Sequence, residues 1–444
     1  MNCDFYRWLC TNHALYYSAV LYTHGEEIVR DSGKLRFVDR HVGVAICSAF
    51  SALAKLRPAP KSGNIKNILV MELFEMGAAM MIYPSLQYIK SHAKDATVYC
   101  LTLKSIKGSW ELLNAIPGEN IYAIDDKNLF SFFTSLFGNI LKLRKKNIDL
   151  IIDYELFMRV SAIISFMITS KFRAGFNRYE LEGLYRGTFY DHKCAFNQNS
   201  HIAKNFLALT RTALGFEQEY PNYKGHISAS ELSVPVYQAD AVLANGLREK
   251  IKAFYPEYAD NRLILVAPDV GYNLAIRNYP RDFIVDVINK ILDDFPDKLV
   301  LLVGTGDNME SCENVAKNVD RDRCINFCNQ APRLREFFEL LHLSELLITN
   351  DNGPAHFAAA TGTRVLALFS TDSPFIYGPL GNCVIMYSFY QCSPCISAFN
   401  HKTSKCSNNL CLQAIKPDAV YEMAVKIIDG SVTFRTVNGT LRYV

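Results

Sequence analysis

The sequence predicts an α/β protein with two Rossmann-like parallel-sheet domains that face a cleft, preceded by an N-terminal helical leader. The chain has 444 residues, half of them hydrophobic and a fifth charged, which suits two or three globular domains. Short apolar runs alternate with longer helix-type segments, once in residues 67–240 and again in residues 260–429. Such alternation is typical of parallel sheets covered by helices.

The first of these regions opens with an apolar run at residues 68–71, which is typical of a buried parallel strand. A turn around Gly77 and a helical stretch to about Lys90 follow. Residues 98–101 and 150–152 are predicted as further strands. We therefore expect residues 1–66 to form the leader and residues 67–240 to form the first domain.

The second region repeats this pattern after a largely helical bridge at residues 229–262. Residues 430–444 are interpreted as a tail. The expected strands are 263–267, 299–303, 346–349 and 365–369, and the expected helices are 281–295, 309–318, 333–342 and 354–361.

The leader contains one apolar helical face. Its members recur at spacings of three and four residues, and Pro58 and Pro60 end the segment. Basic residues flank it on both sides, so residues 40–57 fit a helix lying on an anionic membrane surface. A helix packed on the first domain fits equally well. The face consists of Val42, Ile46, Phe50, Leu53 and Leu56.

Charge and cysteine content narrow the function classes. The net charge of +3 argues against nucleic acid as a partner. Thirteen cysteines scattered along a long chain are not the pattern of a disulfide scaffold. We find no signal peptide at the start and no apolar run of the ~20 residues that a membrane span needs. A cytoplasmic protein, peripheral at most to the inner face of the membrane, is expected.

An anion site is predicted where the strand at 346–349 ends. Asp351 or Asn352 can cap the next helix, Pro354 suits its first turn, and Gly353 permits close approach of a ligand. A helix that begins there directs free N–H groups and a positive dipole end at a phosphate. His356 can add a side-chain donor, although a merely capped helix would show the same pattern.

Three more residues are expected near this anion. Gly271 follows the strand at 263–267, and Gly304 follows the strand at 299–303. Arg277 could reach back to a diphosphate and offset the charge that grows on a leaving group. A solvated loop arginine is the alternative.

Taken together, these stretches resemble glycosyltransferase family 9, the heptosyltransferases of bacterial lipopolysaccharide synthesis. The resemblance implies a fold of the GT-B type and an inverting transferase that needs no catalytic metal. It places a nucleotide-sugar donor on the second domain and a glycan or glycolipid acceptor on the first. The matching residues are 277–280, 304–306, 351–356 continuing through 358–363, 365–369, 371–374 and 378–379.

One position departs from the family pattern, which places an aspartate after the glycine of the first strand–loop–helix unit as the catalytic base. Here that glycine is Gly77, and Ala78 follows it. Glu75 lies in the same loop and Glu72 at the strand end, and either carboxylate could reach an acceptor hydroxyl. The resemblance favours Glu75 as the base.

A cluster of cations in the first domain is a candidate site for an acidic acceptor. A mixed-charge loop surface explains the cluster equally well. With Gly77, the candidate acceptor-binding residues are Arg159, Arg186, His201 and Lys204.

Four cysteines near the end have spacings that suit a structural Zn or Fe site, with disulfides or free thiols as alternatives. They are Cys392, Cys395, Cys406 and Cys411, in a loop over residues 392–411.

The function predicted from the sequence is thus metal-independent transfer of a sugar, heptose being one candidate, from a nucleotide sugar to a glycan or glycolipid. Two other functions remain open. One is a nucleotide-sugar epimerase on the same fold. The other is an inactive binding or assembly subunit, because Ala78 replaces the usual acid.

Overall fold

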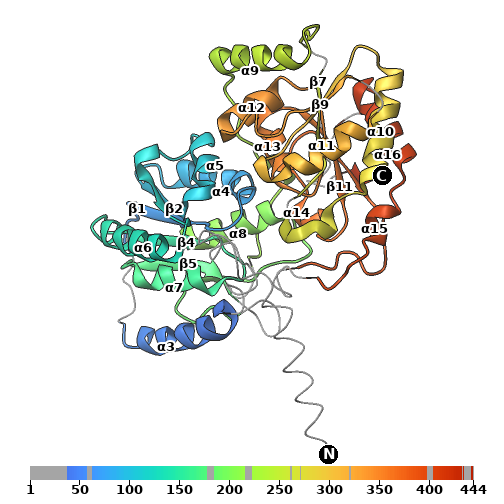
Figure 1. Cartoon of the computed structure of the whole chain (residues 1–444). Coiled ribbons are helices and arrows are strands. Elements are labelled where there is room, and N and C mark those ends of the chain that lie inside the picture. Colours follow the sequence, from blue (N-terminus) through green and yellow to red (C-terminus); the bar gives the residue numbers. More distant parts are fainter. Residues whose placement is uncertain are drawn as a thin grey trace, which may run out of the picture.

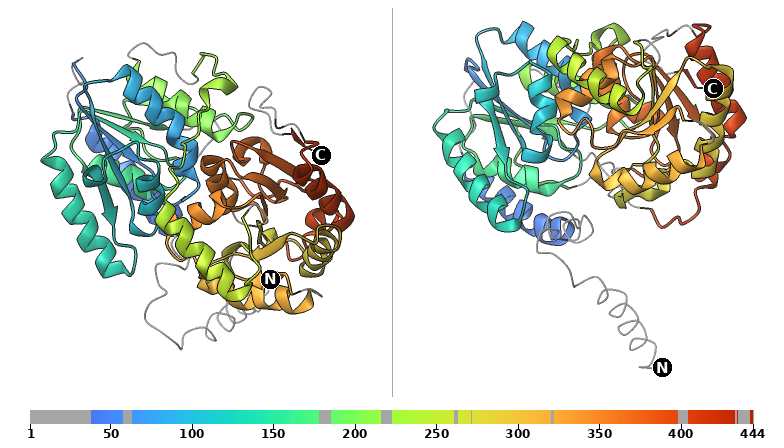
Figure 2. Two further views of the ribbon diagram at one scale, coloured as in Figure 1. Left: turned by 90° about the horizontal axis from the view of Figure 1, so that it is seen from above. Right: turned by 45° about the horizontal axis from the view of Figure 1, so that its top comes forward.

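Two parallel sheets, each covered by helices, lie side by side in the protein (Figures 1 and 2). The architecture is known from a computed structural model. The residues that it describes are 38–57, 63–177, 185–215, 223–260, 263–270, 272–319, 322–397, 404–432, 434 and 442–443.

The first sheet has the strand order β3-β2-β1-β4-β5-β6, and all its pairings are parallel. Because β1 lies between β2 and β4, the strand order reverses beside it, which is where ligands bind in open parallel sheets. The strands are β1 (Asn67–Met71), β2 (Thr97–Leu103), β3 (Ile121–Ile124), β4 (Leu150–Asp153), β5 (Phe172–Phe176) and β6 (His192–Cys194).

Helices cover both faces of this sheet. Successive side chains of a strand point to opposite sides, and here the apolar side chains of both sides are buried under helices. Ile68 and Val70 pack toward α4 and α8, whereas Leu69 and Met71 pack toward α6 and α7. The helices are α4 (Ala78–His92), α5 (Lys107–Leu112), α6 (Leu129–Arg144), α7 (Arg159–Met167) and α8 (Ile202–Leu214), with 3₁₀ turns η2 (Lys104–Ile106) and η3 (Gly118–Asn120).

The second sheet has the order β13-β12-β11-β10-β7-β8-β9, again with parallel pairings throughout. Its reversal point lies between β7 and β10. The stretch expected to be a tail supplies β13. The strands are β7 (Leu263–Ala267), β8 (Leu299–Leu302), β9 (Cys324–Asn326), β10 (Leu346–Asn350), β11 (Arg364–Phe369), β12 (Cys383–Tyr387) and β13 (Arg442–Tyr443).

One face of the second sheet packs under α10, α11 and α16, and the other under α12 and α13. The second group packs against α4 and α5 of the first half. The helices are α9 (Ala241–Phe254), α10 (Arg281–Asp294), α11 (Met309–Asn318), α12 (Leu334–His342), α13 (Gly353–Thr361), α14 (Pro374–Tyr377), α15 (Leu410–Gln413) and α16 (Pro417–Ile428), with η4 (Ala229–Glu231), η5 (Tyr272–Arg277) and η6 (Gly306–Asn308).

The leader helix α3 (Val44–Ala54), which continues a π-helical turn η1 (Asp39–Gly43), packs on α7. Phe50 stacks on Phe166, with ring centroids 4.4 Å apart. The predicted apolar face is divided, because Leu53 and Leu56 remain exposed. Within the described residues, every helix is too short or too polar to cross a bilayer.

The predicted fold class of two Rossmann-like sheets is confirmed. The strands that the sequence predicted begin and end within two residues of the expected positions, as β7 (Leu263–Ala267) and β10 (Leu346–Asn350) show. Loops that follow the carboxyl ends of strands in both sheets meet where the two halves adjoin.

Candidate functional site

The loop after β1 touches the first turn of α13, so the two predicted site loops meet. A Cβ placed on Gly77 would lie only 2.8 Å from Cδ2 of His356. Glycine therefore permits this close approach, since a larger residue would push the histidine ring away. The contact brings the candidate base loop to the candidate anion site.

At the N-terminal end of α13, backbone N–H groups are available as hydrogen-bond donors. Asn352 is the N-cap residue, but its side chain does not bond to the N–H groups of the first turn. Its Oδ1 instead accepts a hydrogen bond from Thr349 Oγ1 at 2.8 Å. Gly353 and Pro354 begin the helix. The end thus retains unused N–H groups and a positive dipole, which suit a phosphate.

Asn350 fixes the loops around the reversal point of the second sheet. Its Nδ2 donates to the carbonyl of Pro268 at 2.9 Å, and its Oδ1 accepts from the N–H of Tyr279 at 3.0 Å. The loop after β7 is thereby joined to the end of β10. Gly271 lies outside the described residues.

Gly304 begins the turn after β8, the neighbour of β7. A Cβ there would lie 2.8 Å from Cβ of Asn308, so the turn requires glycine at this position. This turn lies beside β7, and within it Thr305 Oγ1 donates to Asn308 Oδ1 at 3.0 Å.

Arg277 is held by acidic residues rather than free in a loop. Its guanidinium pairs with the Asp372 carboxylate, lies 3.7 Å from Asp351 and donates to Thr371 Oγ1 at 3.2 Å. All three partners follow the ends of β10 and β11. The arginine is therefore positioned at the same edge of the sheet as the start of α13.

The cysteine-rich loop supports the backbone on either side of Arg277. Asn409 Nδ2 donates to the carbonyls of Ile276 at 3.1 Å and Asn278 at 2.8 Å. These bonds lie just before Cys411, so this end of the cysteine-rich loop helps to hold the backbone around Arg277.

Three carboxyl groups, those of Glu72, Glu75 and Glu155, lie close together near the Gly77 loop. Glu72 is buried, and burial first, then Glu155, raises its pKa well above the usual value. Burial likewise raises the pKa of Glu155 to about 7. The charge of Glu75 acts on both groups. Glu75 is the member of the three that is partly exposed, so it is the one accessible from outside.

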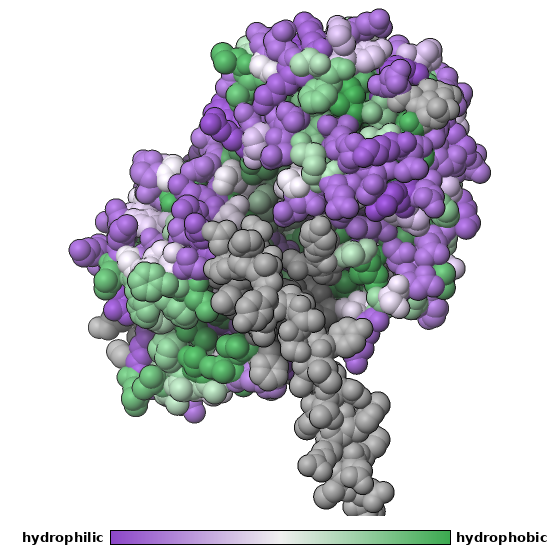
Figure 3. Space-filling model, viewed as in Figure 1, coloured by the Kyte–Doolittle hydropathy of each residue, from purple (hydrophilic) through white to green (hydrophobic). Residues whose placement is uncertain are grey.

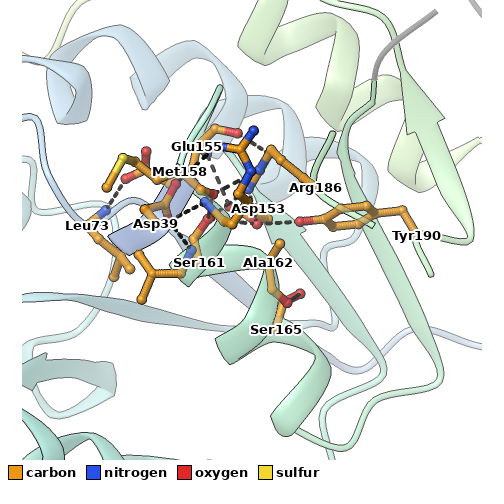
Figure 4. Close-up of polar contacts among 12 residues, drawn as sticks. Asp39, Leu73, Asp153, Glu155, Met158, Ser161, Ala162, Ser165, Arg186 and Tyr190 are labelled. Carbon is orange, nitrogen blue, oxygen red and sulfur yellow. Dashed lines mark hydrogen bonds and ion pairs between the residues drawn. The ribbon is translucent and has the colours of Figure 1, made fainter. Parts of the chain in front are cut away.

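Arg186, expected to bind an acceptor, is instead completely buried. It pairs with Asp153 and donates to the carbonyl of Met158 at 3.1 Å, and Tyr190 Oη donates to Asp153 Oδ2 at 2.6 Å (Figure 4). Glu155 joins the same network through its N–H. The guanidinium is committed to holding the loop after β4, so the structure assigns Arg186 to the scaffold.

Arg159 is also interior. Its Nη1 lies 3.2 Å from Asp39 Oδ2 and its Nε donates to the carbonyl of Tyr185 at 3.0 Å. This arginine joins the leader to α7 and presents no open surface to an acceptor.

His201 lies where the two halves meet. Its Nε2 bonds to the carbonyl of Gly378 at 2.8 Å, and its Nδ1 accepts from the N–H of Ala203 at 3.2 Å. Burial lowers its pKa to about 4, so the ring is neutral at pH 7. Lys204, one helical turn along, is partly exposed. His201 therefore connects the halves, and Lys204 is the cation of the predicted set that remains open to a ligand.

The predicted four-cysteine metal site is not formed by the described residues, where no three side chains of His, Cys, Asp or Glu are placed to hold an ion. Cys406 Sγ contacts the carbonyl of Asn408 at 3.1 Å. None of the four predicted cysteines, Cys392, Cys395, Cys406 and Cys411, forms a disulfide.

Three residues of this region were not among the predicted site residues. Asn350 ends the buried strand β10 and Asp372 lies three residues after β11, positions that should have marked them. Glu155 follows β4 in the same manner. One oxygen of Asp372, Oδ1, has no hydrogen-bond partner within the described part of the chain, although the residue is buried.

Comparison with known proteins places these features in a family. The profile of glycosyltransferase family 9 (heptosyltransferase) matches residues 139–405, more than half of the chain. A lipopolysaccharide heptosyltransferase 1 from Campylobacter coli is 26% identical over 314 residues, which are 69% of this chain and 85% of that protein.

Solved structures show the same fold. A family 9 glycosyl transferase from Veillonella parvula has a TM-score of 0.65 at 16% identity and covers 84% of this chain and 100% of its own. The ADP-heptose lipopolysaccharide heptosyltransferase II of E. coli has a TM-score of 0.61 at 14% identity, covering 83% and 99%. Both likenesses support the two-sheet GT-B architecture.

Proposed function

Because the chain belongs to glycosyltransferase family 9, whose members transfer sugars, we propose that it moves a heptose from ADP-heptose to a lipopolysaccharide-core acceptor. The Campylobacter coli relative is named as a lipopolysaccharide heptosyltransferase, and the E. coli structure is that of an ADP-heptose enzyme. The acceptor would be a membrane glycolipid, so the enzyme would work at the cytoplasmic face of the membrane.

In this proposal the donor binds the second sheet. Its diphosphate lies against the N–H groups at the start of α13, with His356 as a further donor and Arg277 as the cation. Asp351 and Asp372 hold Arg277 in place before the donor arrives, so little reorganisation is needed as charge develops on the leaving group. The unused oxygen of Asp372 suits a hydroxyl of the donor sugar.

The acceptor hydroxyl is activated from the first sheet. Glu75 removes its proton, and the oxygen attacks the anomeric carbon opposite the departing diphosphate, which inverts that centre. No metal takes part in this step. The contact between Gly77 and His356 supports the proposal most directly, because it sets the base loop against the phosphate site.

The test replaces Glu75 with glutamine and measures heptose transfer at steady state together with donor affinity by calorimetry. We expect kcat to fall about a hundredfold or more, because the general base is lost, while donor affinity changes little. Glu119→Gln, an exposed carboxylate remote from both loops, is the matched control and should keep full activity.

Near-normal turnover by Glu75→Gln would remove Glu75 from the mechanism and direct attention to Glu72. A product that remains a free nucleotide sugar would instead indicate an epimerase. No turnover by the unaltered chain with any donor or acceptor would indicate a binding subunit.

A further inference from the structure

Helix α6 (Leu129–Arg144) is apolar on two faces. Its inner stripe, which includes Leu136, Ile140 and Leu143, packs on the first sheet. Its outer stripe is exposed and equally apolar, whereas a surface helix normally has polar residues there. The outer stripe consists of Leu129, Phe130, Phe133, Phe137 and Leu141, with Phe130 79% exposed.

The charges on this helix have one sign. It contains no aspartate or glutamate, and exposed Lys142, Lys145 and Lys146 stand at its C-terminal end. Two carboxylates, Asp125 and Asp126, precede the helix, and Asp125 pairs with Lys104 at 2.9 Å. An apolar face with cationic residues at its end is complementary to an anionic bilayer surface.

The leader adds a second exposed stripe on the same side of the molecule. Val38, Val42, Leu53 and Leu56 point away from α7, on which α3 packs. Arg144 of α6 donates to the carbonyl of Met167 at 2.7 Å and so joins α6 to the C-terminal end of α7. Figures 1 and 3 show α6, α7 and α3 on one side, where hydrophobic atoms gather on the surface.

Helix α10, on the surface of the second half, lacks such an exposed apolar stripe. The exposed residues of α10 are all charged: Arg281, Asp282, Asp293 and Asp294. Exposed apolar side chains are concentrated on α6 and the leader around α3, and contiguous exposed surface of this kind marks an interaction site.

We propose that the outer stripes of α6 and α3, here called the apolar face, bind the surface of a membrane that contains anionic lipids. The helices lie in the interface with their phenylalanines and leucines among the acyl chains and their lysines near lipid phosphates. The role of this contact rests on the proposed function, because it would present a lipid acceptor to the enzyme.

The position of α6 relative to the site fits this role. The helix begins shortly after the end of β3, at the same edge of the sheet as the Glu75 loop, because parallel strands end at one edge. β3 and β1 are two strands apart, which is about 10 Å. An acceptor held at the membrane surface is thus close to the proposed base.

The test is cosedimentation of the full chain with vesicles of phosphatidylcholine and phosphatidylglycerol, mixed roughly three to one. The variant carries serine at Phe130, Phe133 and Phe137. We expect its vesicle affinity to fall about tenfold or more, because three buried aromatic side chains are lost from the bilayer. Circular dichroism and thermal unfolding confirm that it folds.

Two further variants sharpen the experiment. Val242→Ser with Phe254→Ser changes exposed apolar residues on α9 and should leave vesicle binding unaltered. Lys142→Glu with Lys145→Glu should weaken binding to the mixed vesicles but not the weaker binding to pure phosphatidylcholine, because only the electrostatic attraction is removed.

Equal vesicle binding by the triple-serine variant and the unaltered chain would overturn the proposal. So would a dimer of the unaltered chain that the same substitutions dissociate, in the absence of vesicle binding, since the face would then bind a second copy. Transfer to a soluble, lipid-free acceptor is measured in parallel. Its complete absence would count against the proposed function, whereas the vesicle result would stand independently.

Discussion

Glu155 shows how a buried carboxyl group can support a site without touching substrate. Its Oε1 accepts from the N–H of Leu73 at 2.9 Å, and its own N–H donates to Asp153 Oδ1 at 3.1 Å. It thus joins the loop after β4 to the loop that holds Glu75. Burial raises its pKa to about 7, so a proton is retained where an exposed glutamate has lost it.

This proton makes stability depend on pH. Between the unfolded pKa of about 4.5 and the folded pKa of about 7, the native state binds one proton more than the unfolded state. The stabilisation is full below this window and falls as pH rises through it, by at most about 1.4 kcal/mol per pH unit. Glu155→Gln should make that decline smaller, leaving the part that Glu72 contributes through its own raised pKa, measured as the free energy of unfolding in urea from pH 5 to pH 8.

Glu119→Gln, which removes an exposed carboxylate, should retain the pH dependence of the unaltered chain. Parallel pH profiles for Glu155→Gln and the unaltered chain would show that Glu155 titrates normally in the folded protein.

Asp39, in the turn η1 that leads into α3, helps to attach the leader to the first half. Asp39 accepts from the N–H groups of Arg159 at 2.8 Å and Val160 at 2.9 Å, which caps α7, and it also neutralises the buried Arg159 side chain. Removing a partner from a buried ion pair leaves an uncompensated charge. The element is therefore a fixed part of the first half.

Asp39→Ala should lower the free energy of unfolding by about 3 kcal/mol, because the cap of α7 is lost and the buried arginine charge is left without a partner. Urea denaturation measures this. Asp418→Ala removes an exposed partner of Lys290 and should change stability by less than about 1 kcal/mol. An equally small effect of Asp39→Ala would mean that the Asp39–Arg159 pair contributes little to holding the leader in place.

The elements that sequence patterns predicted best are the buried strands, since a short apolar run between turn residues is typical of a strand inside a parallel sheet. Strands β3, β5, β6, β9, β12 and β13 were not predicted. The edge strands β3, β6 and β9 are short and less uniformly apolar, whereas β12 was missed although it is buried and apolar throughout. The membrane interpretation of residues 40–57 identified a helix correctly. It could not show that Phe50 packs inward while Leu53 stays exposed, because that division depends on α7.

The arrangement of the candidate site was predictable where it depends on backbone geometry alone. Gly77, Gly353 and His356 lie together as expected because strand ends and helix starts meet at one edge of each sheet. The roles of charged side chains were harder to predict, because an arginine that binds a ligand and one that pairs with a buried aspartate look the same in sequence. Arg159 and Arg186 proved to be of the second kind. Only the tertiary structure distinguishes the two.

At the scale of the whole molecule, the two sheets share one continuous core. α4 packs against α13 and α5 against α12, and buried side chains from both halves belong to the same cluster. The His201–Gly378 hydrogen bond crosses the same boundary. The candidate base and the candidate phosphate site are therefore held in register by packing, not by the loops alone.

The central claim is that this boundary holds a nucleotide diphosphate between α13 and the Glu75 loop. A crystal structure with a non-transferable ADP-heptose analogue tests it most directly. We predict phosphate oxygens within hydrogen-bond distance of the N–H groups that begin α13, Arg277 and His356 beside them, and the anomeric carbon facing Glu75. A diphosphate bound away from α13, or a sugar directed away from the Glu75 loop, would contradict the account.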